Sequence, residues 1–132
     1  DILDTALAMR MRDCTQQAVL PVLRALENEL CAIAERDSET AQIGRTHGQH
    51  AVPITFGFAI AEYVSRLGKS IIEIDRLSRD LRGKLSGPVG AYNGTSLLTR
   101  DPEELERRYL DYAGLKPSEY STQLAEPFTL SF

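Results

Sequence analysis

The sequence predicts an all-α protein, part of a long-helix bundle, and two observations support that prediction. Apolar residues recur every three to four positions along two long stretches, near residues 2–34 and 53–82. Glycines and prolines, which interrupt helices, separate and follow these stretches. Two helices of about 30 residues would each be about 45 Å long and would leave apolar surface uncovered. We therefore expect more helices, from further sequence or other subunits, to complete the bundle.

The first expected helix covers about residues 2–34. Pro21 lies inside it and removes a backbone hydrogen bond, so we expect a kink and not two separate helices. Cys14 and Cys31 share this helix about 25 Å apart, which exceeds the reach of a disulfide. They are predicted to be free thiols, as in a reducing cytoplasm. The apolar stripe consists of Met11, Cys14, Ala18, Leu23, Leu26, Leu30 and Ile33.

The second expected helix begins near Pro53, a residue suited to a first helical turn. Charges of both signs line its polar face, which is typical of a solvated surface or a subunit contact. The glycine-rich stretch 83–94 must then form a loop. The apolar positions are Ile60, Val64, Leu67, Ile71, Ile74 and Leu81.

A third, short helix is indicated after Asp101. This residue fits an N-cap, Pro102 fits the first helical position, and Glu104 fits the capping box. Gly114 is expected to end the helix, and residues 115–132 show no period.

The composition narrows the class of protein. A net charge of −4 disfavours a sequence-independent nucleic-acid binder. No apolar run approaches the length of a membrane span, and the sequence has no signal-peptide pattern. A cytoplasmic protein is therefore expected, with no nucleic-acid or membrane partner. No phosphate-binding or dinucleotide glycine motif is present, so no cofactor is implied.

The segment GRTHGQHAVP, residues 44–53, concentrates the residues most suited to chemistry. His47 could exchange protons near neutral pH, and Thr46 and Gln49 could hydrogen-bond a polar substrate. Composition alone favours a simpler interpretation, in which a junction histidine bonds only nearby backbone. A metal site made by His47 and His50 would lack the further ligands that zinc requires, so no metal is predicted.

The extended segment GRTHGQHAVPITFG resembles the Thr-His motif of the adenylosuccinate lyases, which belong to the fumarase/aspartase superfamily of helical lyases. Three other blocks resemble that family in the same order: DILDTALAMRMRD, EIDRLSRDLRGKLSGPVGAYN and GLKPSEYSTQ. The resemblance extends to Pro127. The family continues there with another long helix, whereas this chain ends at Phe132.

The resemblance implies a role for three residues. His47 corresponds to the general acid that protonates the leaving nitrogen, and Thr46 and Gln123 correspond to substrate-binding residues. His50 is at most a supporting residue, and Ser86 lies near the family's active site without a definite role. Residues 1–132 would form part of the central helical-bundle domain. The family's N-terminal domain, catalytic-serine loop and C-terminal domain would lie outside this internal fragment.

The resemblance also implies a reaction. Family members eliminate fumarate from adenylosuccinate, giving AMP, and from the succinylated carboxamide ribotide of purine biosynthesis. They are homotetramers that build each active site from several subunits. Because the catalytic base is missing here, the chain alone is expected to be inactive. Two alternatives remain: a sister lyase acting on argininosuccinate or a carboxymuconate, or a non-catalytic helical oligomerisation module.

Overall fold

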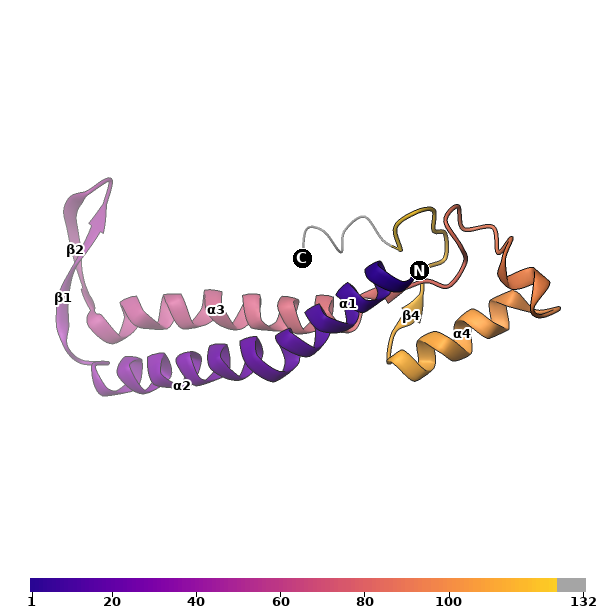
Figure 1. Cartoon of the computed structure of the whole chain (residues 1–132). Coiled ribbons are helices and arrows are strands. Elements are labelled where there is room, and N and C mark those ends of the chain that lie inside the picture. The colour runs from indigo at the N-terminus through magenta and orange to yellow at the C-terminus, as the bar shows by residue number, and fades with distance from the viewer. Residues whose placement is uncertain (126–132) are drawn as a thin grey trace. The chain divides into compact units, whose positions relative to one another are not determined.

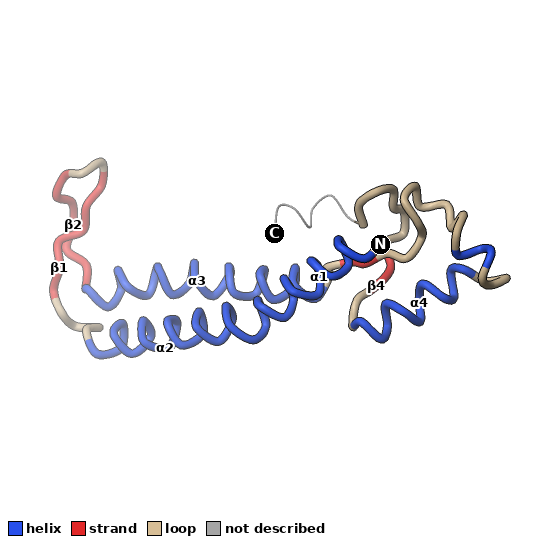
Figure 2. Tube along the Cα trace, viewed as in Figure 1, coloured by secondary structure: helices blue, strands red, loops and turns tan. Residues whose placement is uncertain are grey.

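A computed structural model describes residues 1–125 (Figures 1 and 2). The chain divides into two compact units. One unit comprises Asp1–Gln17 and the chain from Asp75 onward, and the other comprises Ala18–Ile74. The difference from the family expected after Pro127 lies outside the described residues. The helices are α1 (Ile2–Cys14), a π-helical turn (Thr15–Val19), α2 (Leu20–Arg36), α3 (Phe56–Arg79), a 3₁₀ turn (Thr95–Leu97) and α4 (Pro102–Ala113). The strands are β1 (Ala41–Thr46), β2 (Gln49–Thr55), β3 (Arg82–Gly83) and β4 (Lys116–Pro117).

The expected interruption near Pro21 takes the form of a π-helical turn. Helical structure continues from Ile2 to Arg36, with Thr15–Val19 in the π conformation directly before α2. Pro21 lies in the first turn of α2. Because proline has no N–H, a carbonyl one turn earlier loses its usual partner, and the π-helical turn lies where that bond is missing. The prediction of one interrupted helix is confirmed.

The all-α prediction is incomplete, because residues 41–55 form an antiparallel β-hairpin. The all-α prediction places no strand between the two long helices and starts the second helix near Pro53; both expectations are wrong. Pro53 lies within β2, opposite Ile43. In a two-stranded sheet each strand has an open edge, so a strand proline need not break a ladder bond.

Thr55, not Pro53, marks the start of α3. Its Oγ1 accepts the backbone N–H of Phe58 at 3.2 Å, as an N-cap threonine does. The turn between α2 and β1 supplies two further acceptors: the Thr40 carbonyl for the N–H of Phe56, and the Asp37 carbonyl for that of Gly57. The first amides of α3 are therefore satisfied before the helix supplies its own acceptors.

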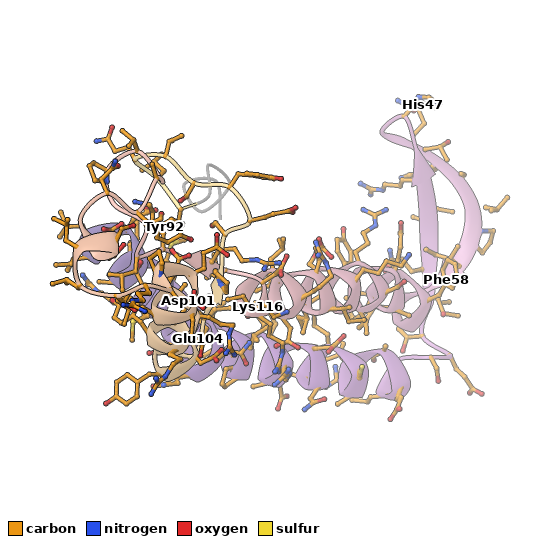
Figure 3. All side chains as sticks on the ribbon, turned by 90° about the vertical axis from the view of Figure 1, so that its right-hand side faces the viewer. His47, Phe58, Tyr92, Asp101, Glu104 and Lys116 are labelled. Carbon is orange, nitrogen blue, oxygen red and sulfur yellow. The ribbon has the colours of Figure 1, made fainter. Side chains whose placement is uncertain are left out.

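Helices α2 and α3 lie side by side within the second unit (Figures 1 and 3). A side chain on Gly57 would meet the Ala34 carbonyl oxygen at 2.3 Å, and one on Gly68 would meet Glu27 Oε1 at 2.5 Å. These glycines therefore permit close helix contact. Large apolar side chains on both helices remain exposed, namely Val22, Leu26, Phe58, Tyr63 and Ile72.

The core of the first unit is small. Ala8, Leu81, Leu110 and Leu115 are buried together, with Met9, Met11 and Tyr109 packed against them. Strands β3 and β4 pair in parallel, and Gly83 of β3 packs against the core residues Leu110 and Leu115. A Cβ on Gly83 would approach Leu110 Cδ2 to 2.5 Å, so only glycine lets β3 lie so close. The prediction that Leu81 belongs to α3 is wrong, because α3 ends at Arg79, but its burial fits the apolar pattern.

Helix α4 begins and ends as its local sequence predicts. Asp101 accepts the N–H of Glu104 at 2.9 Å, and Gly114 adopts the left-handed conformation that ends the helix. The capping-box partner differs: Thr99 Oγ1 accepts the Asp101 N–H, while Glu104 pairs with Arg107.

Two smaller expectations also have outcomes. Both cysteines are free thiols. Within residues 1–125, no helix combines the length and apolar character needed to cross a membrane.

Candidate functional site

His47 occupies the tip of the β1–β2 hairpin (Figure 3). Thr46 pairs with Gln49, leaving His47 and Gly48 as a two-residue turn. Both turn residues have positive φ, 51° for His47 and 74° for Gly48. That combination defines a type I′ turn, which matches the twist of paired strands. Histidine tolerates this conformation better than most side chains, so the backbone itself holds His47 at the apex.

The turn presents its polar side chains to solvent. Every residue from Arg45 to His50 is exposed, including Thr46 and His47, two of the three predicted site residues. A general acid works best where water is excluded and the substrate is fixed. Surfaces beyond the hairpin would have to supply that enclosure.

A bulge shapes the hairpin below its tip. The pairing register shifts between Ile43 and Arg45, with Gly44 between them. A Cβ on Gly44 would lie 2.7 Å from the carbonyl oxygen of Val52. Bulges re-aim the residues that follow them and often lie near functional sites. Gly44 therefore helps to set the direction of Thr46 and His47.

Gln123, the third predicted site residue, belongs to the first unit. It is exposed and lines a cavity of about 440 Å³ together with Asp1, Ile2, Leu3 and Asp4. The cavity therefore joins Gln123 to the beginning of α1. His47 and Thr46 belong to the second unit, whereas Gln123 belongs to the first.

The glycine-rich loop after β3 is fixed by a buried lysine. The Lys84 side chain is 1% exposed, and its ammonium donates to Asp1 Oδ1 at 2.7 Å and to the Gly87 carbonyl at 2.6 Å. The Gly87 N–H donates back to the Asp1 carboxylate at 3.1 Å. Thr5 Oγ1 donates to the Lys84 carbonyl and accepts the Lys84 N–H. The buried ammonium is thus paired with a carboxylate and hydrogen-bonded to a carbonyl, and it holds the loop against α1.

The same loop contacts the segment that contains Gln123. Ser86 Oγ lies 2.7 Å from Ser121 Oγ. Gly90 packs so closely that a Cβ would lie 1.9 Å from the Ser121 carbonyl oxygen. Farther along, the Ala125 N–H donates to the Asp4 carboxylate. Residues 121–125 are thus placed by the loop on one side and by α1 on the other.

Glu106 connects this loop to α4. It is buried, and its carboxylate accepts the Leu85 N–H at 2.6 Å and the Tyr92 hydroxyl at 2.5 Å. Burial, followed by the hydrogen bond to Glu106, raises the pKa of Tyr92 well above its usual value of about 10. Tyr92 also has a positive φ of 55°, so the loop holds it in an unusual conformation.

Sequence reasoning missed Lys84, Glu106 and Tyr92. Glu106 had one usable signal, since it falls on the same helical stripe as buried Leu110 and Ala113. Lys84 had none, because nothing in GKLSG distinguishes a buried lysine from an exposed one. Among residues 1–125, no group of three or more potential metal ligands is suitably placed.

The long helices, the Thr-His turn and the glycine-rich loop are the elements in which the sequence resembles the helical lyases. The lyase family model matches residues 1–126, so the chain belongs to this family of lyases. Adenylosuccinate lyase from Thermotoga maritima is 34% identical over 125 residues, and that from Pyrococcus horikoshii is 35% identical over 127. These alignments cover 94% and 96% of this chain. The expected resemblance to adenylosuccinate lyases is confirmed.

A solved structure of a related lyase is similar to this chain in fold. The class II fumarase of Schistosoma mansoni matches with a TM-score of 0.64 at 26% identity and covers 95% of this chain. This similarity supports a partial helical domain of the fumarase type. The chain spans 27% of the fumarase and 27% of each adenylosuccinate lyase named above.

Proposed function

We propose that this chain is part of an adenylosuccinate lyase, to which it contributes the general acid His47 and the substrate-binding residues Thr46 and Gln123. The observation that carries the proposal is 34–35% identity to adenylosuccinate lyases along 94–96% of the chain. The reaction is the elimination of fumarate from adenylosuccinate, giving AMP, and from the succinylated carboxamide ribotide of purine biosynthesis.

The chemistry divides between this chain and residues outside it. A base removes a proton from carbon, that electron pair forms the C=C bond of fumarate, and the C–N bond breaks. The leaving nitrogen takes the bonding electrons together with a proton, and His47 supplies that proton. His47 is exposed at a tight turn, so a substrate that other surfaces enclose against the hairpin can reach its side chain.

Gln123 has separate structural support as a substrate contact. Its cavity is shared with the first turn of α1. In the resemblance, that helix directly follows the Thr-Ser substrate-binding motif of the family. Gln123 thus lies beside the helix that follows this motif in the resemblance, which supports a substrate contact.

We further propose that residues 1–132 belong to the central helical-bundle domain of a cytoplasmic homotetramer. The exposed apolar residues of α2 and α3 support assembly, because Val22, Phe58 and Ile72 remain 68%, 65% and 70% exposed. The catalytic base lies outside this chain in the resemblance. The 132-residue chain alone should therefore release no fumarate, and measurable turnover by it would refute this part of the proposal.

The decisive test uses a chimeric Thermotoga maritima adenylosuccinate lyase in which residues 1–125 of this chain replace the matched segment. Cleavage of adenylosuccinate is followed for the parent chimera and for His47→Asn. Asparagine favours the first position of a type I′ turn, so the variant removes the acid while keeping the hairpin. The rate constant kcat should fall about 10²- to 10⁴-fold with folding and assembly intact. His50→Asn makes the same change on β2, where a much smaller loss is expected.

Other outcomes separate the alternatives. Equal activity of parent and His47→Asn would remove the acid role from His47. A folded chimera that cleaves argininosuccinate or a carboxymuconate, but not adenylosuccinate, would move the assignment to a sister lyase. A chimera that assembles as a tetramer without any lyase activity would favour the oligomerisation module, which the exposed apolar faces also fit.

A further inference from the structure

Glu106 is a buried carboxylate that the proposed reaction does not use. It lies on α4 with 3% of its surface exposed. One carboxylate oxygen accepts the Leu85 N–H at 2.6 Å, and the other accepts the Tyr92 hydroxyl at 2.5 Å. A carboxylate is costly to bury unless such donors compensate it. Here the donors come from the two sides of the glycine-rich loop.

The two donors enclose the part of the loop that contacts the Gln123 segment. Tyr92 donates its N–H to the Ser86 carbonyl at 2.8 Å, which closes the loop between the points held by Glu106. Inside this closed loop, Ser86 Oγ meets Ser121 Oγ, and Gly90 packs against the Ser121 carbonyl. The position of Ser121 therefore depends on the loop, which Glu106 holds at Leu85 and Tyr92 while Lys84 holds it at Gly87.

The segment has a second attachment that does not involve Glu106. Strand β4 pairs with β3, and the Ser118 N–H donates to the Gly83 carbonyl at 3.2 Å. These bonds fix the segment where it leaves β4. Ser121 and Ala125 each lie two residues from Gln123, and Ala125 is held by the Asp4 carboxylate of α1. Ser121 is the one of the two that the glycine-rich loop holds, so the loop controls how the chain enters Gln123.

We propose that Glu106 is a positioning residue that orients the substrate-binding segment 121–123 through the glycine-rich loop. This inference rests on the proposed function, in which Gln123 contacts the substrate. It predicts an effect on substrate binding and not on proton transfer, because His47 belongs to the other unit.

The chemistry of the side chain offers a graded test. Leucine at position 106 fills a similar volume but leaves the Leu85 N–H and the Tyr92 hydroxyl without their acceptors. Glutamine keeps one oxygen for the Leu85 N–H, and its amide can donate to the Tyr92 oxygen. Glu106→Gln should therefore rescue most of what Glu106→Leu loses. Glu103, exposed on the same helix, provides the matched control Glu103→Leu.

The kinetic arm uses the active chimeric lyase. We expect Glu106→Leu to raise KM for adenylosuccinate about tenfold, with kcat and its pH profile nearly unchanged. Glu106→Gln and Glu103→Leu should stay within about twofold to threefold of the parent KM. A general loss of folded enzyme would lower the apparent kcat instead. An unchanged KM in Glu106→Leu, or an equal rise in Glu103→Leu, would overturn the proposal.

The structural arm uses the 132-residue chain itself, so it does not depend on the reaction. Hydrogen exchange in the peptide covering residues 118–125 should accelerate in Glu106→Leu and stay slow in Glu103→Leu. An inactive parent chimera would defeat the proposed function, while unchanged exchange would defeat the positioning role. If Glu106→Leu does not fold, the same exchange and KM measurements are made on Tyr92→Phe. It removes one of the two bonds, and unaltered exchange and KM would overturn the proposal.

Discussion

The side-chain oxygens of Ser86 and Ser121 lie 2.7 Å apart and join the glycine-rich loop to the segment that contains Gln123. The backbone makes this contact tighter still. Gly90 has a φ of +72°, and a Cβ there would lie 1.9 Å from the Ser121 carbonyl oxygen. The loop and the segment therefore fit together only when residue 90 has no side chain.

Replacing Gly90 by alanine should destabilise the protein by at least about 2–3 kcal/mol, since left-handed strain adds to displacement of Ser121. Urea unfolding measures the change in free energy of unfolding.

Two other glycines of the same loop, Gly87 and Gly94, serve as controls. Gly87 has a φ of +85° but open space around it, so alanine there should cost only about 1 kcal/mol. Gly94 has open space and an ordinary φ of −77°, so alanine should be neutral or slightly stabilising. Equal costs at positions 87 and 90 would contradict the close contact.

Lys84→Met should also be strongly destabilising. The change leaves the Asp1 carboxylate and the Gly87 carbonyl without the buried ammonium that now bonds both. Removing one member of a buried pair typically costs about 3–5 kcal/mol, and partial exposure of Asp1 favours the lower end. Lys69→Met, on the exposed face of α3, is the matched control and should change stability by less than about 0.5 kcal/mol. Similar unfolding curves for the two variants would exclude an anchoring role for Lys84.

Helix α4 shows where sequence reasoning succeeds. Its start depends on Asp101 and Pro102 and its end on Gly114, and each of these residues acts on backbone groups only a few residues away. Local chemistry of this kind can be recognised without a partner from elsewhere in the chain. The long apolar stripes and the interruption at Pro21 were predictable for the same reason.

The hairpin shows where local reasoning fails. The two turn residues His47 and Gly48 lack the usual Asn-Gly or Asp-Gly pattern of a type I′ turn, so the hairpin resembled an irregular linker. The motif around His47 was identified through family resemblance, but its position at a hairpin tip was not. Glu106 and Lys84 were missed because their bonding partners lie 21 and 83 residues away in sequence. Only the fold brings such partners together.

The start of α3 offers a direct check of the revised boundary. Thr55→Ala removes the side-chain acceptor for the Phe58 N–H and should cost about 1 kcal/mol, as loss of an N-cap does. Pro53→Ala, two residues earlier within β2, should cost less because it caps nothing. The free energy of unfolding and helical circular dichroism measure both changes. A larger loss of stability in Pro53→Ala than in Thr55→Ala would indicate that the helix begins near Pro53, as the sequence predicts.

Tyr92 should make the stability of the protein depend on alkaline pH. Burial and the hydrogen bond to Glu106 raise its pKa in the folded state above the unfolded value of about 10. A folded state that holds the proton more tightly is stabilised fully below about pH 10 and loses that stabilisation as pH rises through the folded pKa. The free energy of unfolding should thus fall more steeply above about pH 10 in the parent than in Tyr92→Phe. Tyr112→Phe, at a position 95% exposed, should behave as the parent does.

Glu106→Gln should move the pKa of Tyr92 back toward its usual value. The absorbance of tyrosinate, titrated with pH and compared with the same titration of Tyr92→Phe, measures this pKa. Identical alkaline slopes in the parent and Tyr92→Phe would mean that the hydroxyl is not held by Glu106 in solution.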